Sequence, residues 1–394
     1  MAKNKGDGRT RGRRPATEVV LVGRNPAEQH GFVNTPIYRG STVLAPTVEQ
    51  FLSKSARFVY GRRGTPTTEA LANAITSLEG GAGTALTSSG LSAITAALIA
   101  VTRAADHVLV SDGVYGPNRH FCDTLLARSG VEVQYYDPLI GGAISEQFRT
   151  NTRAVFLESP SSLSFEVQDV PAIVAAAKAR RLVTLIDNTW ATPIYFRPHD
   201  HGIDISIQAG TKYLGGHADA NLGTISATAE LWPQVHGAVG TLGVNPGPED
   251  VFLMLRGLRT LAVRLERHMA SGLKVARWLA GRPEVLRVLH PALETHPQHA
   301  IWKRDFQGAS GLFSVILNSR PQSAVNAFIE ELELFGLGAS WGGFESLIIP
   351  FDCTKFRTAT RWNPGGPGVR LHVGLEDPDD LIADLENGLK RLAE

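Results

Sequence analysis

The sequence contains 394 residues, of which 43% are hydrophobic and 20% are charged, and this composition is typical of a globular protein. The net charge of +1 gives no general reason to expect nucleic-acid binding, and no apolar run approaches the roughly 18–20 residues that cross a membrane. The two cysteines, Cys122 and Cys353, exclude a disulfide framework and indicate a cytoplasmic protein.

The chain opens with a basic segment in which Lys and Arg alternate with Gly, Thr and Pro. It has few apolar residues and no hydrophobic stretch of the kind found in secretory signals. We expect the first ~17 residues to be a disordered, solvated part of an N-terminal arm rather than a nucleic-acid-binding or targeting tail.

From about residue 65 the pattern alternates between helix and strand. Thr65-Pro66 predicts the start of one helix, and Ser88-Ser89-Gly90 predicts the start of a second. Strands are predicted at residues 107–111, 131–136, 154–157, 183–186, 203–208 and 223–226, with helices at 118–128 and 172–181. Strands separated by helices predict a mostly parallel sheet that is covered on both faces.

The remainder of the chain predicts long helices over 249–279, punctuated by Gly257 and by the Gly281-Arg282-Pro283 break. A smaller unit follows, with strands at 311–317 and 369–373 and helices at 324–334 and 379–392. We therefore expect three parts, which are an arm (1–60), a large domain (61–255) and a small C-terminal domain (256–394).

Two candidate chemical groups stand at the ends of predicted strands. Asp187 ends the apolar strand at 183–186, and Lys212 follows the strand at 203–208 within a glycine-rich loop. Alone, Lys212 could be a surface charge and Asp187 a turn or cap residue. The carboxyl ends of parallel strands are, however, where α/β sheets bind their ligands, so neighbouring strands could present both groups at one edge.

Further candidates carry polar or aromatic groups in loops. Backbone N–H groups at Gly90 and Leu91 would open a helix and could bind a phosphate, although Ser89 could simply be a helix cap. Tyr115 could stack on a ring or pack on the core. Arg62 could bind phosphate or be solvated, and Arg370, in an apolar strand, needs an anionic partner from the substrate or from the protein.

Taken in order, these segments resemble the Cys/Met metabolism family of enzymes that depend on pyridoxal 5′-phosphate (PLP). The resemblance spans roughly residues 30–392. It rests on the runs YGRRGTPT (60–67), SSGL (88–91), ESP (158–160), DNT (187–189), TKYLG (211–215), GGFESL (342–347) and RLHVGLE (370–376). It implies the α/β type I PLP (aspartate aminotransferase-like) fold, with a large, mostly parallel-sheet domain that binds PLP and a smaller C-terminal α/β domain. It also implies a homotetramer built of active dimers.

The resemblance also implies a role for each matching position. Lys212 would hold PLP as a Schiff base and act as the catalytic base, with Tyr115 stacked on the ring as a second catalytic residue. Asp187 would pair with the ring nitrogen. The phosphate would be bound by Gly90, Leu91 and Thr211 and, from a neighbouring subunit, by Tyr60 and Arg62. The substrate would be bound by Arg370, Ser340 and Trp341. No metal site is implied.

Two positions differ from the usual family pattern, and one loop indicates which reaction of the family to expect. Ala209 stands where many relatives have a serine that contacts the phosphate, and Ser162 replaces an asparagine that lies near the ring. The Ser340-Trp341-Gly342-Gly343 loop resembles that of bacterial cystathionine β-lyases, which implies release of a thiol, pyruvate and ammonia from cystathionine or a related cysteine conjugate. A γ-acting family member and a non-catalytic regulatory protein remain as alternatives.

Overall fold

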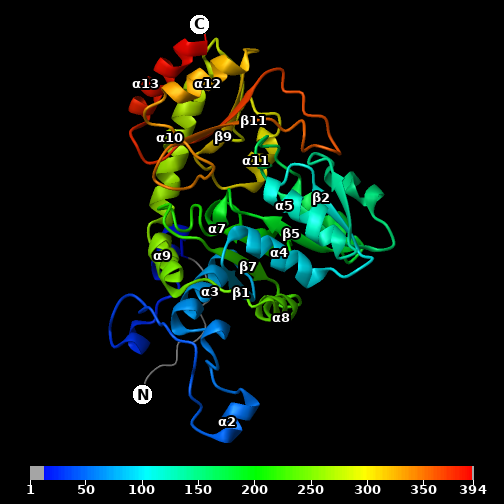
Figure 1. Ribbon diagram of the computed structural model, residues 1–394, viewed down its shortest axis with the longest axis vertical. Helices are drawn as coiled ribbons and strands as arrows, with labels where there is room; N and C mark the ends of the chain where they lie inside the picture. Colours follow the sequence, from blue (N-terminus) through cyan, green and yellow to red (C-terminus); the bar gives the residue numbers. More distant parts are fainter. Residues whose placement is uncertain (1–12, 393–394) are drawn as a thin grey trace.

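The computed structural model describes residues 13–392 of the chain. Two β-sheets follow one another along the long axis, and an N-terminal arm projects from the end opposite the small sheet (Figure 1). The disorder expected at the N-terminus falls mainly on residues 1–12, which lie outside the described residues. Residues 15–17 do not share it, because helix α1 (Pro15–Leu21) begins there.

The large sheet has seven strands in the order β1-β7-β6-β5-β4-β2-β3. Its strands are β1 (Gly83–Thr87), β2 (His107–Ser111), β3 (Glu132–Tyr136), β4 (Thr152–Glu158), β5 (Val183–Asp187), β6 (Ile205–Ala209) and β7 (Gly223–Ala227). Strand β7 runs antiparallel to both of its neighbours, and the other four pairings are parallel. The prediction of a mostly parallel sheet is confirmed.

Helices cover both faces of this sheet, as expected for buried parallel strands. They are α3 (Pro66–Glu79), α4 (Gly90–Val101), α5 (Gly116–Phe121), α6 (Val170–Ala179), α7 (Thr192–Tyr195), α8 (Trp232–Leu242) and α9 (Pro248–Leu258). Apolar side chains of α3, α6 and α9 form one core layer, and those of α4 and α8 form the other. Helix α3 begins as its sequence predicts, with Thr65 in a capping box before Pro66 and Gly80 ending the helix in the left-handed conformation.

The C-terminal unit contains a smaller, mainly antiparallel sheet in the order β10-β11-β12-β9-β8. Its strands are β8 (Val285–Leu289), β9 (Leu312–Leu317), β10 (Gly336–Leu337), β11 (Leu347–Phe351) and β12 (Gly368–His372). Its helices are α10 (Leu261–Ala280), α11 (His299–Asp305), α12 (Gln322–Glu331) and α13 (Pro378–Leu389). A separate apolar cluster lies between this sheet and its helices. The expected domain boundary at 255/256 falls within α9, and the division into domains stays a prediction.

The structure differs from the sequence prediction at several elements. Strands β1, β8, β10 and β11 were not expected, because they are short and lack a clear alternation of apolar and polar residues. Gly257 lies one residue before the end of α9, and α10 begins at Leu261, so the predicted punctuation falls close to the observed break between the two helices. A Cβ atom at this position would stand 2.3 Å from the carbonyl oxygen of Gly215, so glycine serves close packing here. The helix expected at 118–128 contains a π-helical segment at Cys122–Leu126.

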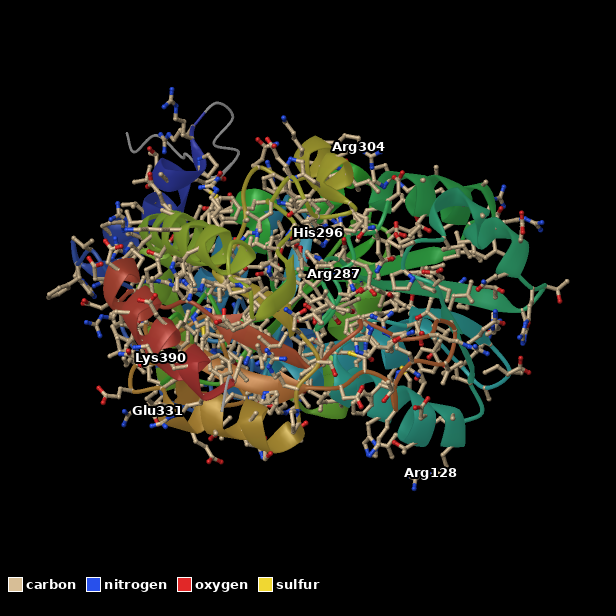
Figure 2. All side chains as sticks on the ribbon, turned by 90° about the horizontal axis from the view of Figure 1, so that it is seen from above. Arg128, Arg287, His296, Arg304, Glu331 and Lys390 are labelled. Carbon is tan, nitrogen blue, oxygen red and sulfur yellow. The ribbon has the colours of Figure 1, made fainter. Side chains whose placement is uncertain are left out.

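The outer surface carries charged side chains on many elements, and Arg128, Glu331 and Lys390 lie at the outside of the molecule in Figure 2. Among the helices that the structure describes, none is both long enough and apolar enough to span a bilayer. The described residues also contain no group of three or more His, Cys, Asp and Glu side chains arranged to hold a metal ion.

Candidate active site at the carboxyl ends of β5 and β6

The central strands of the large sheet bring the two strand-end groups together. Strands β5 and β6 are parallel neighbours, and Asp187 pairs with Ile207 in their register. Lys212 follows the end of β6 by three residues. The sheet edge therefore presents a carboxylate and an amine from adjacent strands, as the position rule for α/β ligand sites predicts.

A cavity of about 190 Å³ opens at this edge. Its lining includes most of the residues predicted from the sequence, namely Gly90, Leu91, Tyr115, Asp187, Thr211, Lys212, Trp341 and Arg370. Residues of the large sheet thus face residues of the C-terminal unit across one hollow. The lining also includes Ala209 and Ser162, the two positions at which the sequence departs from the common family pattern.

Lys212 projects into this cavity and meets the C-terminal unit there. Its Nζ donates a hydrogen bond to Ser340 Oγ at 2.7 Å and lies 5.4 Å from the centre of the Trp341 ring. Burial and the nearby Arg370 cation lower the pKa of Lys212 from 10.5 to about 8. A substantial fraction of the amine is therefore neutral near pH 8, as a nucleophile or a base requires.

Asp187 is held by the residue two places further along the chain. The backbone N–H and the hydroxyl of Thr189 donate to Asp187 Oδ1 at 3.0 and 2.5 Å. The same hydroxyl accepts the N–H of Ala209 at 2.9 Å, which ties the end of β5 to the end of β6. Both bonds from Thr189 go to Oδ1 and neither involves Asp187 Oδ2, so Oδ2 can accept a hydrogen bond from a protonated ligand nitrogen.

Tyr115 is carried by the loop that follows β2 and is 43% exposed. Its backbone N–H donates to Glu158 Oε2 at 2.8 Å, and Glu158 is the register partner of Asp187 on β4. Burial, with Asp187 beside it, raises the pKa of Glu158 well above its usual range. Burial and the same two carboxylates raise the pKa of the Tyr115 hydroxyl, which therefore keeps its proton at neutral pH.

Helix α4 begins where the sequence predicts an anion site. The first N–H groups of a helix have no intrahelical partner, and those of Gly90 and Leu91 stand at the cavity. The Ser89 hydroxyl caps the helix by accepting the N–H of Ser92 at 3.1 Å. Gly90 permits close approach to β6, since a Cβ atom there would lie 2.5 Å from the Cβ of Ala209.

Thr211 differs somewhat from its predicted role at this anion site. Its hydroxyl accepts the backbone N–H of Leu222 at 3.1 Å and lies 3.4 Å from the Leu222 carbonyl oxygen. The side chain therefore fixes the turn before Lys212, and the hydroxyl proton is only weakly engaged. That proton can still be donated to an anion in the cavity.

The C-terminal unit contributes a cation. Arg370 lies on β12, is largely buried and donates to the carbonyl oxygen of Ser340 at 3.3 Å. It forms no ion pair with any Asp or Glu among residues 13–392. Burial lowers its pKa to about 10. A buried cation that faces a cavity without a protein carboxylate fits a carboxylate on the ligand.

Tyr60 and Arg62 are not brought to this cavity within one chain. They line a different and larger hollow of about 910 Å³, whose lining contains neither Lys212 nor Asp187. The Arg62 guanidinium donates to the carbonyl oxygen of Gly240 at 2.8 Å, and Tyr60 is half exposed. Their predicted role at a neighbouring subunit's cofactor needs a second copy and stays a prediction.

Chemically, the cavity fits PLP. The cofactor requires an amine for its aldehyde, a carboxylate for its ring nitrogen and N–H donors for its phosphate. Lys212, Asp187 Oδ2 and the start of α4 supply these three groups in one hollow. Sequence reasoning assigned no role to Glu158 or Thr189, although both belong to the quoted motifs. Their position at or just after the ends of strands was the sequence feature that could have marked them as site residues.

Comparison with known proteins gives one family. The model of the Cys/Met metabolism PLP-dependent enzymes matches residues 16–390. A protein of Rhizobium johnstonii is 51% identical, with 94% of this chain and 95% of that protein covered. Cystathionine beta-lyase of Salmonella typhimurium is 44% identical, with 95% and 98% covered. The solved structure of cystathionine gamma synthase from Xanthomonas oryzae pv. oryzae has a TM-score of 0.89 at 31% identity, with 97% and 99% covered.

Proposed function

The chain belongs to the Cys/Met metabolism PLP-dependent enzymes, and from this premise we propose that it is a carbon–sulfur β-lyase that cleaves cystathionine. In the proposed reaction, cystathionine and water give homocysteine, pyruvate and ammonia. The observation that carries the proposal is the contact of Lys212 with Ser340 beside Trp341. This loop belongs to the sequence pattern that the chain shares with cystathionine β-lyases.

PLP, when bound, supplies an electron-poor ring that accepts the electrons of the substrate Cα–H bond. Asp187 would keep the ring nitrogen protonated by accepting its N–H through Oδ2, because Oδ1 is occupied by Thr189. The backbone N–H groups at the start of α4 would bind the phosphate. Tyr115 would cover the ring, and its loop is fixed by the bond to Glu158.

The proton on Cα is removed by Lys212 Nζ in this proposal. Ser340 Oγ orients the amine, and the pKa of about 8 makes the neutral form available near neutral pH. The Cβ–S bond then breaks and the sulfur leaves as a thiolate that takes up a proton. Tyr115 can donate this proton, since its raised pKa keeps the hydroxyl protonated, and Lys212 is the other candidate donor.

Arg370 selects the substrate class. Its buried guanidinium would pair with the α-carboxylate of an amino acid, and this pairing would place Cα near Lys212. Trp341 forms an apolar wall of the same cavity. The wall would face the carbon chain beyond Cβ and so distinguish cystathionine from other cysteine conjugates.

The oligomeric state belongs to the same proposal. The arm exposes large apolar side chains, with Leu44 88% and Phe51 69% exposed. Apolar exposure on this scale is typical of an interface, so a second copy is the proposed partner. Such a dimer would bring Tyr60 and Arg62 to the partner's cofactor, and a tetramer would contain two dimers. Both cysteines are free and buried, which supports a cytoplasmic enzyme.

The test is to supply cystathionine to the purified protein with PLP and to identify the keto acid that forms. Pyruvate together with homocysteine supports the β-lyase. 2-Oxobutyrate with cysteine would replace it by a γ-lyase, and absence of any keto acid in a PLP-loaded protein would exclude both. The Lys212→Ala variant, treated in the same way, is the control for reaction outside this site.

A further inference from the structure

A buried histidine behind the active site accepts a hydrogen bond from the loop that contacts Lys212. His372 is the last residue of β12, two places after Arg370, so both side chains leave the strand on the same face. The ring is 1% exposed, and it does not line the cavity. Its Nε2 lies 3.0 Å from the backbone nitrogen of Gly342, whose N–H it accepts in the tautomer that carries its proton on Nδ1, and 3.2 Å from the carbonyl oxygen of Gly343.

The loop that His372 holds is pressed against the catalytic lysine. Gly342 has a φ of +84°, and a Cβ atom there would stand 2.9 Å from the carbonyl carbon of Lys212 and the nitrogen of Tyr213. The two residues before Gly342 reach into the site. Ser340 accepts the hydrogen bond of Lys212 Nζ at 2.7 Å, and Trp341 lines the cavity.

One strand therefore holds this loop at two points. Arg370 donates to the carbonyl oxygen of Ser340 at 3.3 Å, and His372 accepts the N–H of Gly342. Arg370 also faces the cavity, so it is available to the substrate, whereas His372 is committed to the loop. When a substrate carboxylate engages Arg370, the bond at His372 becomes the more permanent of the two.

The surroundings of His372 keep its ring able to accept. Its neighbours are the rings of Tyr213 and His268, at 5.9 and 5.2 Å between centroids. Burial, His268 and the cations Arg370 and Lys212 hold the pKa of His372 well below its usual range. A neutral imidazole with its proton on Nδ1, an atom that has no partner among the described residues, accepts the Gly342 N–H, whereas the other neutral tautomer would donate to the Gly343 carbonyl oxygen. Both tautomers bond to the same loop.

We propose that His372 is a positioning residue of the active site, which fixes Ser340 on the Lys212 amine and Trp341 on the cavity wall by holding the Gly342 N–H. The proposal rests on the function proposed above, in which Lys212 moves the Cα proton. It assigns to His372 no contact with substrate or cofactor. Its effect travels only through the loop from Ser340 to Gly342.

The test uses the full-length protein and three substitutions. His372→Leu removes the acceptor, His372→Gln offers an oxygen with the reach of Nε2, and His372→Asn offers an oxygen that falls short. His290 is the matched control, because it is also fully buried in the C-terminal unit and its Nδ1 accepts the backbone N–H of Ala292 at 3.2 Å. His290 does not line the cavity.

The first measurement is amide hydrogen exchange in the protein without PLP, read in a peptide that covers residues 339–346. We expect exchange to rise about tenfold or more in the Leu and Asn variants, since this factor corresponds to about 1.4 kcal/mol of lost protection. The Gln variant should stay within about threefold of the wild type. The His290→Leu variant should leave this peptide unchanged. Equal exchange in the wild type and in His372→Leu would overturn the proposal.

The second measurement is kcat/KM for cystathionine in the PLP-loaded enzyme. Loss of the loop position should lower it by about 10–100-fold in the Leu and Asn variants, mostly through kcat, and Gln should restore most of it. An equal loss in His290→Leu would reduce His372 to a structural residue. If His372→Leu does not fold, the comparison of His372→Gln with His372→Asn tests the proposal. If the wild type forms no pyruvate, the proposed function fails, while the exchange result still judges the role of His372.

Discussion

The cavity at Lys212 and the arm around Tyr60 are built in opposite ways. In the cavity, Lys212, Asp187 and Arg370 are largely buried, and each has a hydrogen-bond partner within the same chain. In the arm, apolar side chains such as Leu44 and Phe51 face solvent, and Arg62 bonds only to a backbone carbonyl among the described residues. The cavity is organised by contacts within the chain, whereas the arm exposes apolar surface that no other part of the chain covers among the described residues.

This difference separates two kinds of dependence. The geometry of the cavity is set within the chain, so changes there should act on chemistry at every protein concentration. In the proposed dimer the arm would contribute by meeting another copy, so changes there should act on assembly and on retention of the cofactor. Each prediction below strengthens or breaks this division.

The largest effect is expected for Lys212→Ala. This change removes the only amine that lines the cavity among the described residues, so the protein should neither bind PLP covalently nor release pyruvate from cystathionine. Absorbance of the purified protein near 420 nm, a wavelength range typical of protonated PLP–lysine linkages, and keto-acid release give the two readouts. A variant that keeps both would refute the assignment of the site.

A smaller but still large effect is expected for Asp187→Asn. The amide cannot hold a proton on the ring nitrogen, and loss of one member of a buried charge pair costs about 3–5 kcal/mol. We expect kcat to fall by roughly 10²–10³-fold, with the loss independent of protein concentration. Thr189→Val is a useful comparison, because it keeps the carboxylate but removes the hydroxyl that orients it.

An intermediate effect is expected for Arg62→Ala, in the turn Gly61–Arg63 that follows the arm. Loss of a charged hydrogen bond to a phosphate costs about 1.5–3 kcal/mol, so PLP affinity should fall by roughly 10–100-fold. The dissociation constant for PLP is measured by adding PLP to the PLP-free protein at several protein concentrations. The division fails if Arg62→Ala impairs kcat at saturating PLP as strongly as Asp187→Asn does. Arg128→Ala, at an exposed residue outside both the arm and the cavity, is the control.

The smallest effect concerns pH. A lysine whose pKa is lowered to about 8 loses its proton as the pH rises through that value. The rate at which added PLP reacts with Lys212 should therefore rise up to about pH 8 and then become constant. Because burial is the main cause and Arg370 the next, Arg370→Met should raise the midpoint, and Arg62→Ala should leave it unchanged. Nα-acetyl-lysine, with a pKa near 10.4, gives the reference curve. A midpoint near that of the free amine would contradict the buried environment.

Much of the site could be predicted because its residues stand at recognisable positions. Lys212 and Asp187 follow clear apolar strands, and parallel strands bring their carboxyl ends to one edge. The start of α4 could be predicted because Ser89 is a typical helix-capping residue directly before Gly90. These predictions need only local pattern and one topological rule.

The parts that could not be predicted depend on contacts between distant segments. Gly257 marks the end of α9 in the sequence, but its close packing against the backbone of Gly215 has no local signal. The partners of Ser340 and His372 come from other elements, with no local pattern to pair them. Strand β11 contains Pro350 and lacks an alternating pattern, so only its pairing with β10 and β12 defines it.

The close approach of Gly90 to Ala209 restricts what evolution can change at the phosphate end of the cavity. A Cβ atom at position 90 would lie 2.5 Å from the Cβ and 2.9 Å from the backbone Cα of Ala209. Because the Cα atom is present whatever residue occupies position 209, a change there cannot make room for a side chain at position 90. Among descendants of this sequence, position 90 should therefore stay glycine while position 209 remains the more evolvable of the two.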